Sequence, residues 1–380
     1  MDTHKARIGE LDFTQQPFVV IWETTRACAL ACGHCRAEAV PHRDPRELST
    51  DEAKRMMDRV REFGRVVFVL SGGDCLARPD VVELVSYGAG IGLRMAATPA
   101  TTGLATPEML HALAEAGLAR LAISLDGSTP AIHDAFRRVP GSFAEGIRIL
   151  EQCRQLGLPT QVNTVIAKHN ENDFDGLAAL MTWLGIVFWE VFFLVPMGRA
   201  QPDDVAAART FEATFHRMYD LAKVAPFDVK ATAAPHYSRV ILQRQVAERN
   251  EGMRTDAPDV LTGGVMFSLR DGIGRARSVN DGDGFMFVSH TGEIFPSGFL
   301  PLPTGNVRDH DLVEIYRHHP TFVALRDRSR LEGKCGVCEY RSVCGGSRAR
   351  AHAVTGDFLA AEPYCTHIPA AWARAHAVSR

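Results

Sequence analysis

The sequence predicts an α/β fold with a parallel β-sheet, and a partial (β/α)6 barrel accommodates its elements. Between residue 18 and about residue 195 of the 380 residues, short apolar runs alternate with segments that have the period of amphipathic helices. Six successive strand–helix units are typical of a parallel sheet with right-handed crossovers. The apolar fraction of 46% supports a sizeable core. Cysteines gather at residues 28–35 and 335–365, and the second group indicates a separate C-terminal unit.

Six short, mostly apolar segments are expected to form the sheet. They are Val19–Thr24, Val66–Ser71, Leu93–Thr98, Leu118–Leu125, Thr160–Ile166 and Val187–Leu194. Because these strands run parallel, their C-terminal ends meet at one edge, which is where parallel α/β folds carry their chemistry. Amphipathic helices are expected between them, and Thr50 followed by two acidic residues is a helix start. These helices are Thr50–Phe63, Val81–Gly90, Pro107–Ala116, Phe143–Leu156 and Asn172–Leu184.

Beyond the sixth strand the pattern changes, and four parts are expected along the chain. The segment from about 200 to 260 is helical and more polar, and residues 263–284 are rich in Gly, Asp and Asn, which indicates a loop. A hairpin is expected over Phe285–Ser289 and Glu293–Pro296, followed by helices over Leu312–His319, Thr321–Arg330 and from Pro369. The parts are an N-terminal extension (1–17), the barrel (18–200), a helical and loop linker (201–284) and a C-terminal domain (285–380).

Composition excludes several classes of function. A net charge of −3 and a pI of about 6.6 do not favour nucleic-acid binding. The first residues, MDTHKARIGELDF, contain no apolar run of a signal peptide, and no segment approaches the roughly 20 apolar residues of a membrane span. We therefore expect a cytoplasmic protein. Nine cysteines in such a protein indicate metal or redox chemistry in place of disulfides.

The most informative motif is Cys28-x3-Cys32-x2-Cys35, directly after the first expected strand. Three thiolates can hold three corners of a [4Fe–4S] cluster and leave the fourth iron without a protein ligand. A closed structural metal site would normally show four neighbouring ligands. The motif therefore favours a catalytic cluster, and the alternative is a zinc site that uses His34 as its fourth ligand.

A second motif lies near the C-terminus, at Cys335-x2-Cys338-x5-Cys344-x20-Cys365. Four cysteines suffice for one fully ligated [4Fe–4S] cluster. A tetrahedral zinc site is the alternative. The two remaining cysteines, Cys75 and Cys153, stand apart and are expected to be packing residues.

The N-terminal spacing resembles that of radical S-adenosylmethionine (SAM) enzymes, and the second motif, with Gly345–Arg348 and Thr355–Asp357 inside it, resembles their SPASM module. The resemblance spans residues 15–370 and is strongest to proteins of haem pathways. It implies a TIM-like partial barrel, a three-cysteine [4Fe–4S] cluster that binds SAM, and auxiliary clusters. Where SPASM modules often have a further cysteine, this chain has Ser297, and a serine oxygen is a poor iron ligand. We therefore expect one auxiliary cluster.

The resemblance also assigns residues to SAM. Gly72-Gly73-Asp74 ends the second strand, where the family has a Gly-Gly-Glu motif that binds the methionine amino group, although the three residues taken alone also suit an ordinary turn. Arg137 is the candidate for the SAM carboxylate, with Arg138 as a rival, and a solvated charged loop is the alternative. The further candidates for ribose or substrate contacts are Ser124, Asp126 and Asn163. For Asn163, a buried structural role is the alternative.

For chemistry, the resemblance implies that an electron donor such as flavodoxin or ferredoxin reduces the cluster. SAM is then cleaved to a 5′-deoxyadenosyl radical, which abstracts hydrogen from a substrate C–H bond. The auxiliary cluster would accept an electron, bind substrate or serve a structural role. The haem-pathway relatives remove or decarboxylate propionate side chains of tetrapyrroles. The extension 1–17 is too short for a fused leader-peptide-binding domain, which favours a small molecule, although such domains also exist as separate chains.

We therefore expect oxidation or decarboxylation of a carboxylate-bearing small molecule. The candidate basic residues for its carboxylates are Arg199, Arg275 and Arg277. The alternatives are a maturase that modifies a ribosomal peptide and a non-enzymatic iron–sulfur or zinc protein. No nucleic acid or membrane partner is expected.

Overall fold

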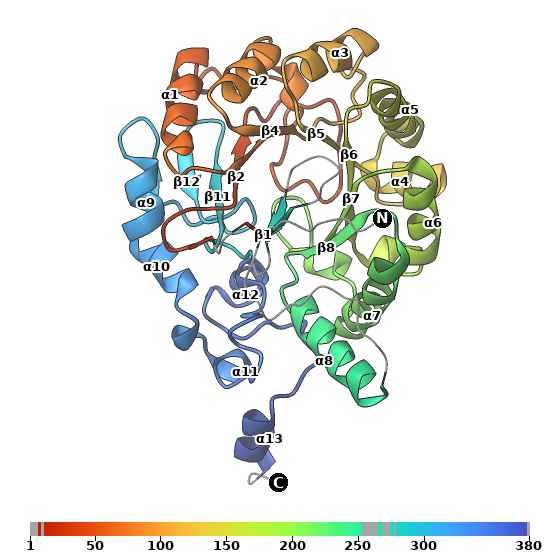
Figure 1. The fold of residues 1–380 in the computed structure, drawn as a ribbon, viewed down its shortest axis with the longest axis vertical. Helices are drawn as coiled ribbons and strands as arrows, with labels where there is room; N and C mark the ends of the chain where they lie inside the picture. The colour runs from red at the N-terminus through yellow and green to blue at the C-terminus, as the bar shows by residue number, and fades with distance from the viewer. Residues whose placement is uncertain (1–6, 9–10, 253–264, 268–273, 277–278, 378–380) are drawn as a thin grey trace.

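A ten-stranded sheet, curled into a partial barrel with helices on its outside, dominates the structure (Figure 1). The computed structural model describes residues 7–8, 11–252, 265–267, 274–276 and 279–377. The sheet has the order β13-β12-β11-β2-β3-β4-β5-β6-β7-β8. Its parallel strands from β2 onward are β2 (Val19–Glu23), β3 (Val67–Ser71), β4 (Arg94–Ala97), β5 (Arg120–Ser124), β6 (Thr160–Ile166), β7 (Phe188–Phe193) and β8 (Asp228–Thr232). The expected parallel barrel is confirmed, and its six expected strands are β2 to β7.

Helices cover the outer face of this sheet. Between the strands lie α1 (Thr50–Arg61), α2 (Val81–Gly90), α3 (Pro107–Glu115), α4 (Pro130–Arg137), α5 (Ser142–Gln155), α6 (Phe174–Leu184) and α7 (Ala208–Val224), with α8 (Tyr237–Asn250) after β8. Helix α1 begins at a capping box, in which the Ser49 side chain accepts from the Glu52 N–H and the Glu52 side chain accepts from the Ser49 N–H. Short 3₁₀ turns occur at η1 (Cys75–Ala77), η2 (Lys168–Asn170) and η3 (Pro202–Asp204).

Side-chain alternation separates the core from the barrel interior. In β2, Val20 and Trp22 are fully buried against the helices, whereas Val19 and Ile21 line an interior cavity. The next strand repeats the pattern, because Phe68 is fully buried outside and Ser71 lines the cavity. The inner surface of the barrel is therefore available to a ligand, and the outer surface supplies the main core.

The barrel sheet extends beyond the part of the chain expected to form it. Strand β8 lies within residues 201–284, which the sequence analysis describes as a helical and loop linker. Its residues are mostly half-buried, so the sequence shows no apolar run there. Strand β11 (Phe285–Val288) pairs in parallel with β2, and the expected hairpin to β12 (Glu293–Phe295) therefore extends the same sheet, with β13 (Gly305–Asn306) beside it. The domain boundaries themselves remain a prediction.

The C-terminal part carries short helices around the second group of cysteines. These are α9 (Leu312–His318), α10 (Pro320–Arg326), α11 (Gly333–Gly336), α12 (Arg348–Thr355) and α13 (Ala370–Ala377). The helix expected over Thr321–Arg330 is divided into α10 and a 3₁₀ turn, η4 (Arg328–Arg330), because the Asp327 side chain caps the second element. A small separate sheet joins β1 (Arg7–Ile8) to β9 (Val265–Phe267) and β10 (Gly274–Ala276), and the last two lie within residues 263–284, the segment expected to be a loop. Over the described residues, no helix has the length and apolarity needed to span a bilayer.

Candidate functional site

The three N-terminal cysteines lie in the loop that follows β2, and each sulfur accepts an N–H hydrogen bond. The Leu30 amide donates to Cys28 Sγ at 3.3 Å, and the Ala39 amide donates to Cys35 Sγ at 3.4 Å. The third donor is the Arg137 guanidinium, whose Nη1 lies 3.7 Å from Cys32 Sγ. Such donors stabilise thiolates, which is the form that binds iron.

The Gly72-Gly73 pair holds the end of β3 against this loop. The Gly73 amide donates to the Thr25 carbonyl and the Asp74 amide donates to the Ala27 carbonyl, both at 2.7 Å. A Cβ atom on Gly72 would lie 2.4 Å from the Thr25 oxygen, and one on Gly73 would lie 2.4 Å from the Ala27 oxygen. The glycines are therefore required for close backbone contact with the cysteine loop.

Asp74 is fully buried at this junction. Its Oδ1 accepts from the Leu76 amide at 3.0 Å and its Oδ2 accepts from the Thr102 hydroxyl. Burial raises the pKa of Asp74, while these two hydrogen bonds lower it. The structure thus gives Asp74 a role in shaping the turn beside the cysteines, and its expected contact with the SAM amino group remains a prediction.

Asp126 and Arg137, two expected SAM contacts, lie against each other beneath the cysteine loop. Asp126 Oδ2 and Arg137 Nη2 are 2.5 Å apart, and Asp126 is fully buried. Burial opposes its charge, but Arg137 lowers the pKa of Asp126 to about 2. Asp126 therefore stays ionised at pH 7, and its carboxylate orients the Arg137 guanidinium toward Cys32. The rival residue, Arg138, lies next to it in a left-handed conformation with φ of 58°.

Histidines surround this ion pair. The His34 ring stacks on Phe136 at 4.1 Å between centroids, and Phe136 stacks in turn on His169 at 3.5 Å. The Asp126 amide donates to His133 Nδ1 at 3.0 Å. Burial lowers the pKa of His34 to about 3 and that of His133 to about 4. Both rings are therefore neutral at pH 7.

The donor atoms around the N-terminal cysteines do not match a tetrahedral zinc site. Tetrahedral zinc with Zn–S bonds of about 2.3 Å holds its sulfurs about 3.8 Å apart. Across the described residues, the only three acidic, histidine or cysteine ligand atoms within 4.8 Å of one another belong to Cys338, Glu339 and His367. In the described structure the N-terminal cysteines and His34 are therefore not gathered as a zinc site. Burial raises the pKa of Cys28 to about 11, so metal binding would have to displace its proton.

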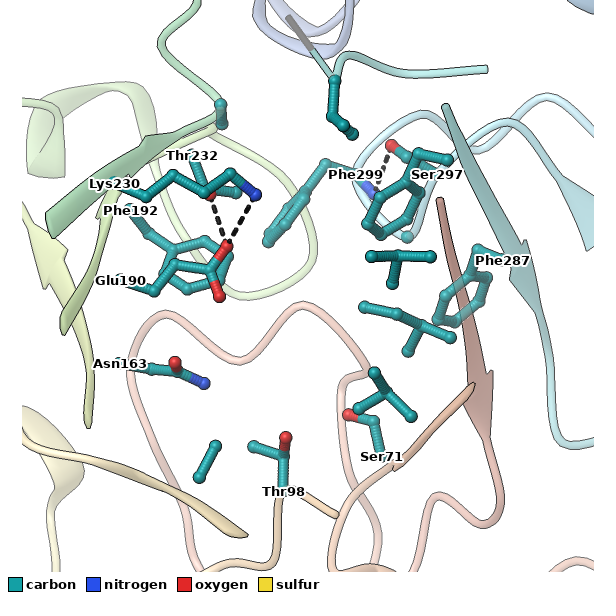
Figure 2. A pocket seen from close by; sticks show the side chains of 18 of the residues that line it. Ser71, Thr98, Asn163, Glu190, Phe192, Lys230, Thr232, Phe287, Ser297 and Phe299 are labelled. Atoms are coloured by element: carbon teal, nitrogen blue, oxygen red, sulfur yellow. Dashed lines mark hydrogen bonds and ion pairs between the residues drawn. The ribbon is translucent and has the colours of Figure 1, made fainter. Parts of the chain in front are cut away.

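A cavity of about 260 Å³ fills the barrel interior (Figure 2). Asn163 faces it, as the sequence analysis considered, and Ser71 and Thr98 line it at the C-terminal ends of their strands. The candidate Ser124 is half-buried at the end of β5 and does not line the cavity. The cavity thus reaches the edge of the sheet that carries the cysteine loop.

One wall of the cavity is a connected polar group that the sequence analysis missed. Glu190 accepts from Thr232 at 2.5 Å and from Gln161 at 2.7 Å, and the Lys230 ammonium lies 3.3 Å from it. The Arg120 guanidinium donates to Gln161 at 3.1 Å. Glu190 could have been recognised from the sequence, because it is a charged residue within the otherwise apolar strand Phe188–Phe193. A parallel strand usually buries both faces, so a charged side chain there indicates that one face contacts a ligand.

The opposite wall is aromatic. Phe287 lies across the cavity from the Glu190–Lys230 pair (Figure 2). Phe192 lies beside Glu190 on β7, and its ring centroid is 6.1 Å from that of Phe299. Arg36, directly after the last N-terminal cysteine, stacks over Phe287 at 4.6 Å and pairs with Glu23 at 2.7 Å. The cavity is therefore amphipathic, because its lining combines apolar rings with charged, hydrogen-bonding side chains.

The basic residues proposed from sequence to meet substrate have different positions. Arg199 donates to the Cys32 and Ala39 carbonyls and so fixes the cysteine loop. Arg275 lies in β10, and Arg277 lies outside the described residues. Lys230 and Arg120 are the basic groups that line the cavity beside Arg36.

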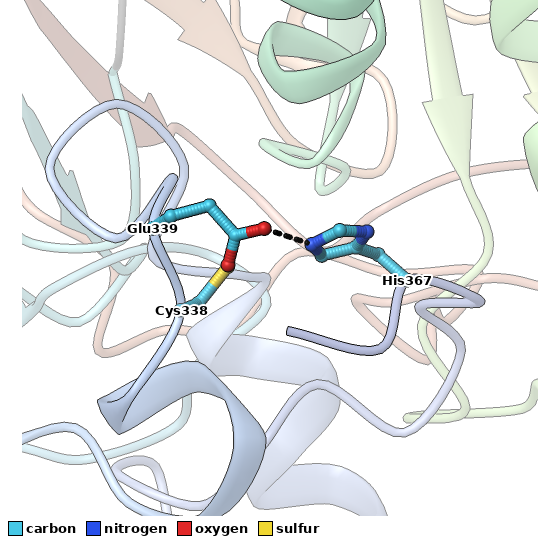
Figure 3. A group of neighbouring side chains, drawn as sticks. All are labelled: Cys338, Glu339 and His367. Atoms are coloured by element: carbon cyan, nitrogen blue, oxygen red, sulfur yellow. Dashed lines mark hydrogen bonds and ion pairs between the residues drawn. The ribbon is translucent and has the colours of Figure 1, made fainter. Parts of the chain in front are cut away.

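The four C-terminal cysteines line one small pocket together. The Glu362 amide donates to Cys335 Sγ and the Gly346 amide donates to Cys344 Sγ, each at 3.3 Å. His367 pairs with Glu339 at 3.0 Å beside Cys338, as Figure 3 shows. Burial raises the pKa of Cys344 to about 12, and it also raises those of Cys338 and Cys365. No three of the four sulfurs are close enough to share one ion, within the described part of the chain.

Ser297, at the position of the missing cysteine, is buried and donates to Asp281. The Asp281 Oδ2 in turn accepts from the Ala349 amide at 2.9 Å. The serine is therefore part of a protein hydrogen-bond network between the hairpin and α12. This arrangement agrees with four cysteines and a single auxiliary site.

Comparison with known proteins places this geometry in a family. Residues 22–181 match the family model described as the radical SAM superfamily. AdoMet-dependent heme synthase from Methanosarcina barkeri is 40% identical over 358 residues, which cover 94% of this chain and 98% of that protein. Fe-coproporphyrin III synthase from the same organism is 30% identical, covering 91% of this chain and 87% of that protein. The crystal structure of Streptococcus suis SuiB bound to S-adenosylmethionine has a similar fold, with a TM-score of 0.68 at 14% identity over 93% of this chain and 78% of that one.

Proposed function

Because this chain belongs to the radical SAM superfamily, in its SPASM-type branch, we propose that it oxidatively decarboxylates propionate side chains of an iron tetrapyrrole to form haem. Membership in the family implies a [4Fe–4S] cluster and SAM. When bound, they supply a 5′-deoxyadenosyl radical that abstracts hydrogen from a substrate carbon. The proposal for the substrate is supported by a relative named as a heme synthase, because the match covers nearly the whole length of both proteins.

The observation that carries the proposal is the amphipathic cavity, which fills the barrel interior and reaches the cysteine-bearing edge of the sheet. A propionate-bearing tetrapyrrole is flat and apolar, with anionic groups at its rim. In our proposal, Phe287 and Phe299 pack against the ring, and the Lys230 ammonium binds a carboxylate. The cavity volume of about 260 Å³ is at the lower limit of ligand pockets, so it would hold one side chain and the adjoining ring rather than the whole macrocycle.

The chain's residues would serve this reaction by holding and shielding the reacting carbon. Glu190 keeps Lys230 in place, and Thr232 and Gln161 also donate hydrogen bonds to the Glu190 carboxylate. Val67, Val69 and Ile21 give the same cavity a dry surface, which protects a reactive radical from water. Conversion of one propionate to a vinyl group releases CO₂, one proton and two electrons. One electron leaves with the abstracted hydrogen atom, and the other passes to a one-electron acceptor.

The test is an anaerobic assay with reduced, reconstituted protein, SAM and iron-coproporphyrin III deuterated in its propionates. We expect deuterium in 5′-deoxyadenosine, together with CO₂ and vinyl products. Cleavage of SAM with no deuterium transfer would reject the tetrapyrrole and leave another substrate, such as a peptide. SAM cleavage by a Cys28/Cys32/Cys35→Ala variant at the wild-type rate would reject the enzyme class.

A single substitution tests the proposed carboxylate contact. Lys230→Met removes a charged hydrogen bond of about 1.5–3 kcal/mol, so KM for the tetrapyrrole should rise at least about tenfold. SAM cleavage without substrate should be unchanged. Lys54→Met is the control, because Lys54 lies on α1 outside the barrel and pairs with Glu83. An unchanged KM for Lys230→Met would place the carboxylate elsewhere.

A further inference from the structure

His236 has no partner for either ring nitrogen, although it is almost completely buried. It immediately precedes α8, is 1% exposed, and lines the same pocket as the four C-terminal cysteines. Phe215 contacts its ring edge-on at 4.7 Å between centroids and fixes its orientation. A buried imidazole without a hydrogen bond is costly, so a partner from outside the polypeptide is expected in this pocket.

Arg239 lies one turn further along α8 and lines the same pocket. It is 3% exposed, and its terminal nitrogens donate to Glu212 at 2.5 and 2.8 Å and to Gln243 at 2.7 Å. Its Nε has no partner in the described structure. Arg239 shares this pocket lining with Cys344 and Cys365. Burial raises the pKa of Cys365, and the positive charge of Arg239 lowers it.

These two side chains differ from the other donors to the cysteines. The Glu362 and Gly346 amides already bond to Cys335 and Cys344, and they would do so with or without a bound group. His236 and Arg239 instead have free N–H capacity, and both residues line the pocket that the four cysteines also line. The four cysteines can ligate the irons of a cluster, and the free N–H groups need a hydrogen-bond acceptor. The sulfur atoms of an iron–sulfur cluster accept hydrogen bonds and would meet this need.

We propose that His236 and Arg239 donate hydrogen bonds to the sulfur atoms of the auxiliary cluster and thereby raise its reduction potential. Hydrogen bonds and positive charge at sulfur offset the negative charge that the cluster gains on reduction, so they favour the reduced state. This inference rests on the auxiliary cluster of the proposed function. It adds two residues, on an element outside the cysteine motif, that set the cluster's electronic properties.

The test is a redox titration of the reconstituted protein followed by electron paramagnetic resonance. His236→Phe removes the N–H groups and retains a ring. At a fixed potential, the ratio of reduced to oxidised auxiliary cluster should fall about tenfold, which corresponds to about 59 mV for one electron. The N-terminal cluster in the same sample should not change, because His236 does not line its site. His111→Phe, at an exposed position on α3, is the matched control.

A second variant separates hydrogen bonding from packing. His236→Gln retains an N–H donor, so its auxiliary cluster should titrate close to wild type. If His236→Phe titrates as wild type does while about eight irons per chain are retained, the inference is wrong, and the histidine bonds to water or to nothing. If the wild type contains four irons and one zinc, the auxiliary cluster itself is absent. SAM cleavage measured on the same sample reports on the N-terminal site independently.

Discussion

At the residue scale, the cysteine loop depends on a buried ion pair that the motif itself does not contain. Asp126 and Arg137 come from the end of β5 and from α4, and Arg137 reaches Cys32. Asp126 also accepts from the Val165 amide at 2.8 Å, which joins it to the next strand. The loop is thus anchored to three elements of the barrel. Replacing either charge would leave the other buried and unpaired.

His133 provides a pH-dependent prediction at this scale. Burial lowers its pKa to about 4, so the folded protein excludes a proton that the unfolded chain binds near pH 6.5. Its contribution to stability is complete above pH 6.5 and is lost as the pH falls toward 4. At pH 5.5 the loss should be about 1.4 kcal/mol.

Denaturant unfolding at pH 7.5 and 5.5 checks this value. His133→Asn retains an acceptor for the Asp126 amide and does not titrate in this range. The wild type should therefore lose about 1.4 kcal/mol more than the variant between the two pH values. Equal losses would show that His133 is not the source of the pH dependence.

Sequence reasoning found the residues whose chemistry is tied to spacing. The seven clustered cysteines and Gly72-Gly73 are recognisable because their positions along the chain are informative without a structure. Glu190, Lys230 and His236 were missed for a physical reason. Each is a single polar residue whose role depends on which strand or helix lies next to it in space. The residues adjacent to it in the sequence do not indicate that neighbour.

At the element scale, the glycines that follow β3 are in close backbone contact with the cysteine loop. Gly73→Ala would place a Cβ atom 2.4 Å from the Ala27 oxygen and 2.6 Å from the Arg26 oxygen. Both are backbone atoms and cannot rotate away, so the loop must move. We expect a loss of about 1–3 kcal/mol in stability and a lower iron content at the N-terminal site.

Gly90→Ala is the matched control for this prediction. Gly90 ends α2, and a Cβ atom there would have no neighbour within 4 Å. Its stability should be unchanged or slightly higher. Iron analysis and denaturant unfolding measure both variants. Wild-type iron content and stability in Gly73→Ala would contradict the steric argument.

The elements with a strong apolar pattern were predicted well, and those at the rims were not. Strands β2 to β7 carry buried residues toward the helices and are recognisable for that reason. Strand β8 lies at the edge of the sheet and presents Lys230 and Thr232 to the cavity, so it has few apolar positions. A polar edge strand cannot be distinguished from a loop by hydrophobic periodicity alone.

At the scale of the whole molecule, Arg350 joins the C-terminal cysteine region to the barrel. This fully buried residue of α12 donates to the carbonyl of Phe193, the last residue of β7, at 2.9 Å and to the carbonyl of Ala233, directly after β8, at 2.8 Å. It also pairs with Glu362 at 3.1 Å, and the Glu362 amide bonds to Cys335. One side chain therefore connects the cavity end of the barrel to the auxiliary site.

Arg350→Met should destabilise the protein by about 3–5 kcal/mol, because it leaves Glu362 buried without a counter-charge. Arg374→Met, at an exposed position on α13, should change the free energy of unfolding by less than about 0.5 kcal/mol. Denaturant unfolding of the two variants and the wild type measures this difference. A loss below about 1 kcal/mol for Arg350→Met would show that the connection contributes little.

The central claim is that Cys28, Cys32 and Cys35 hold a cluster whose fourth iron binds SAM. Electron paramagnetic resonance of the reduced protein, recorded with and without SAM, tests it most directly. The account predicts that SAM changes the signal of the N-terminal cluster and that this response is absent from the Cys32→Ala variant. Identical spectra with and without SAM, from wild-type protein with full iron content, would contradict it.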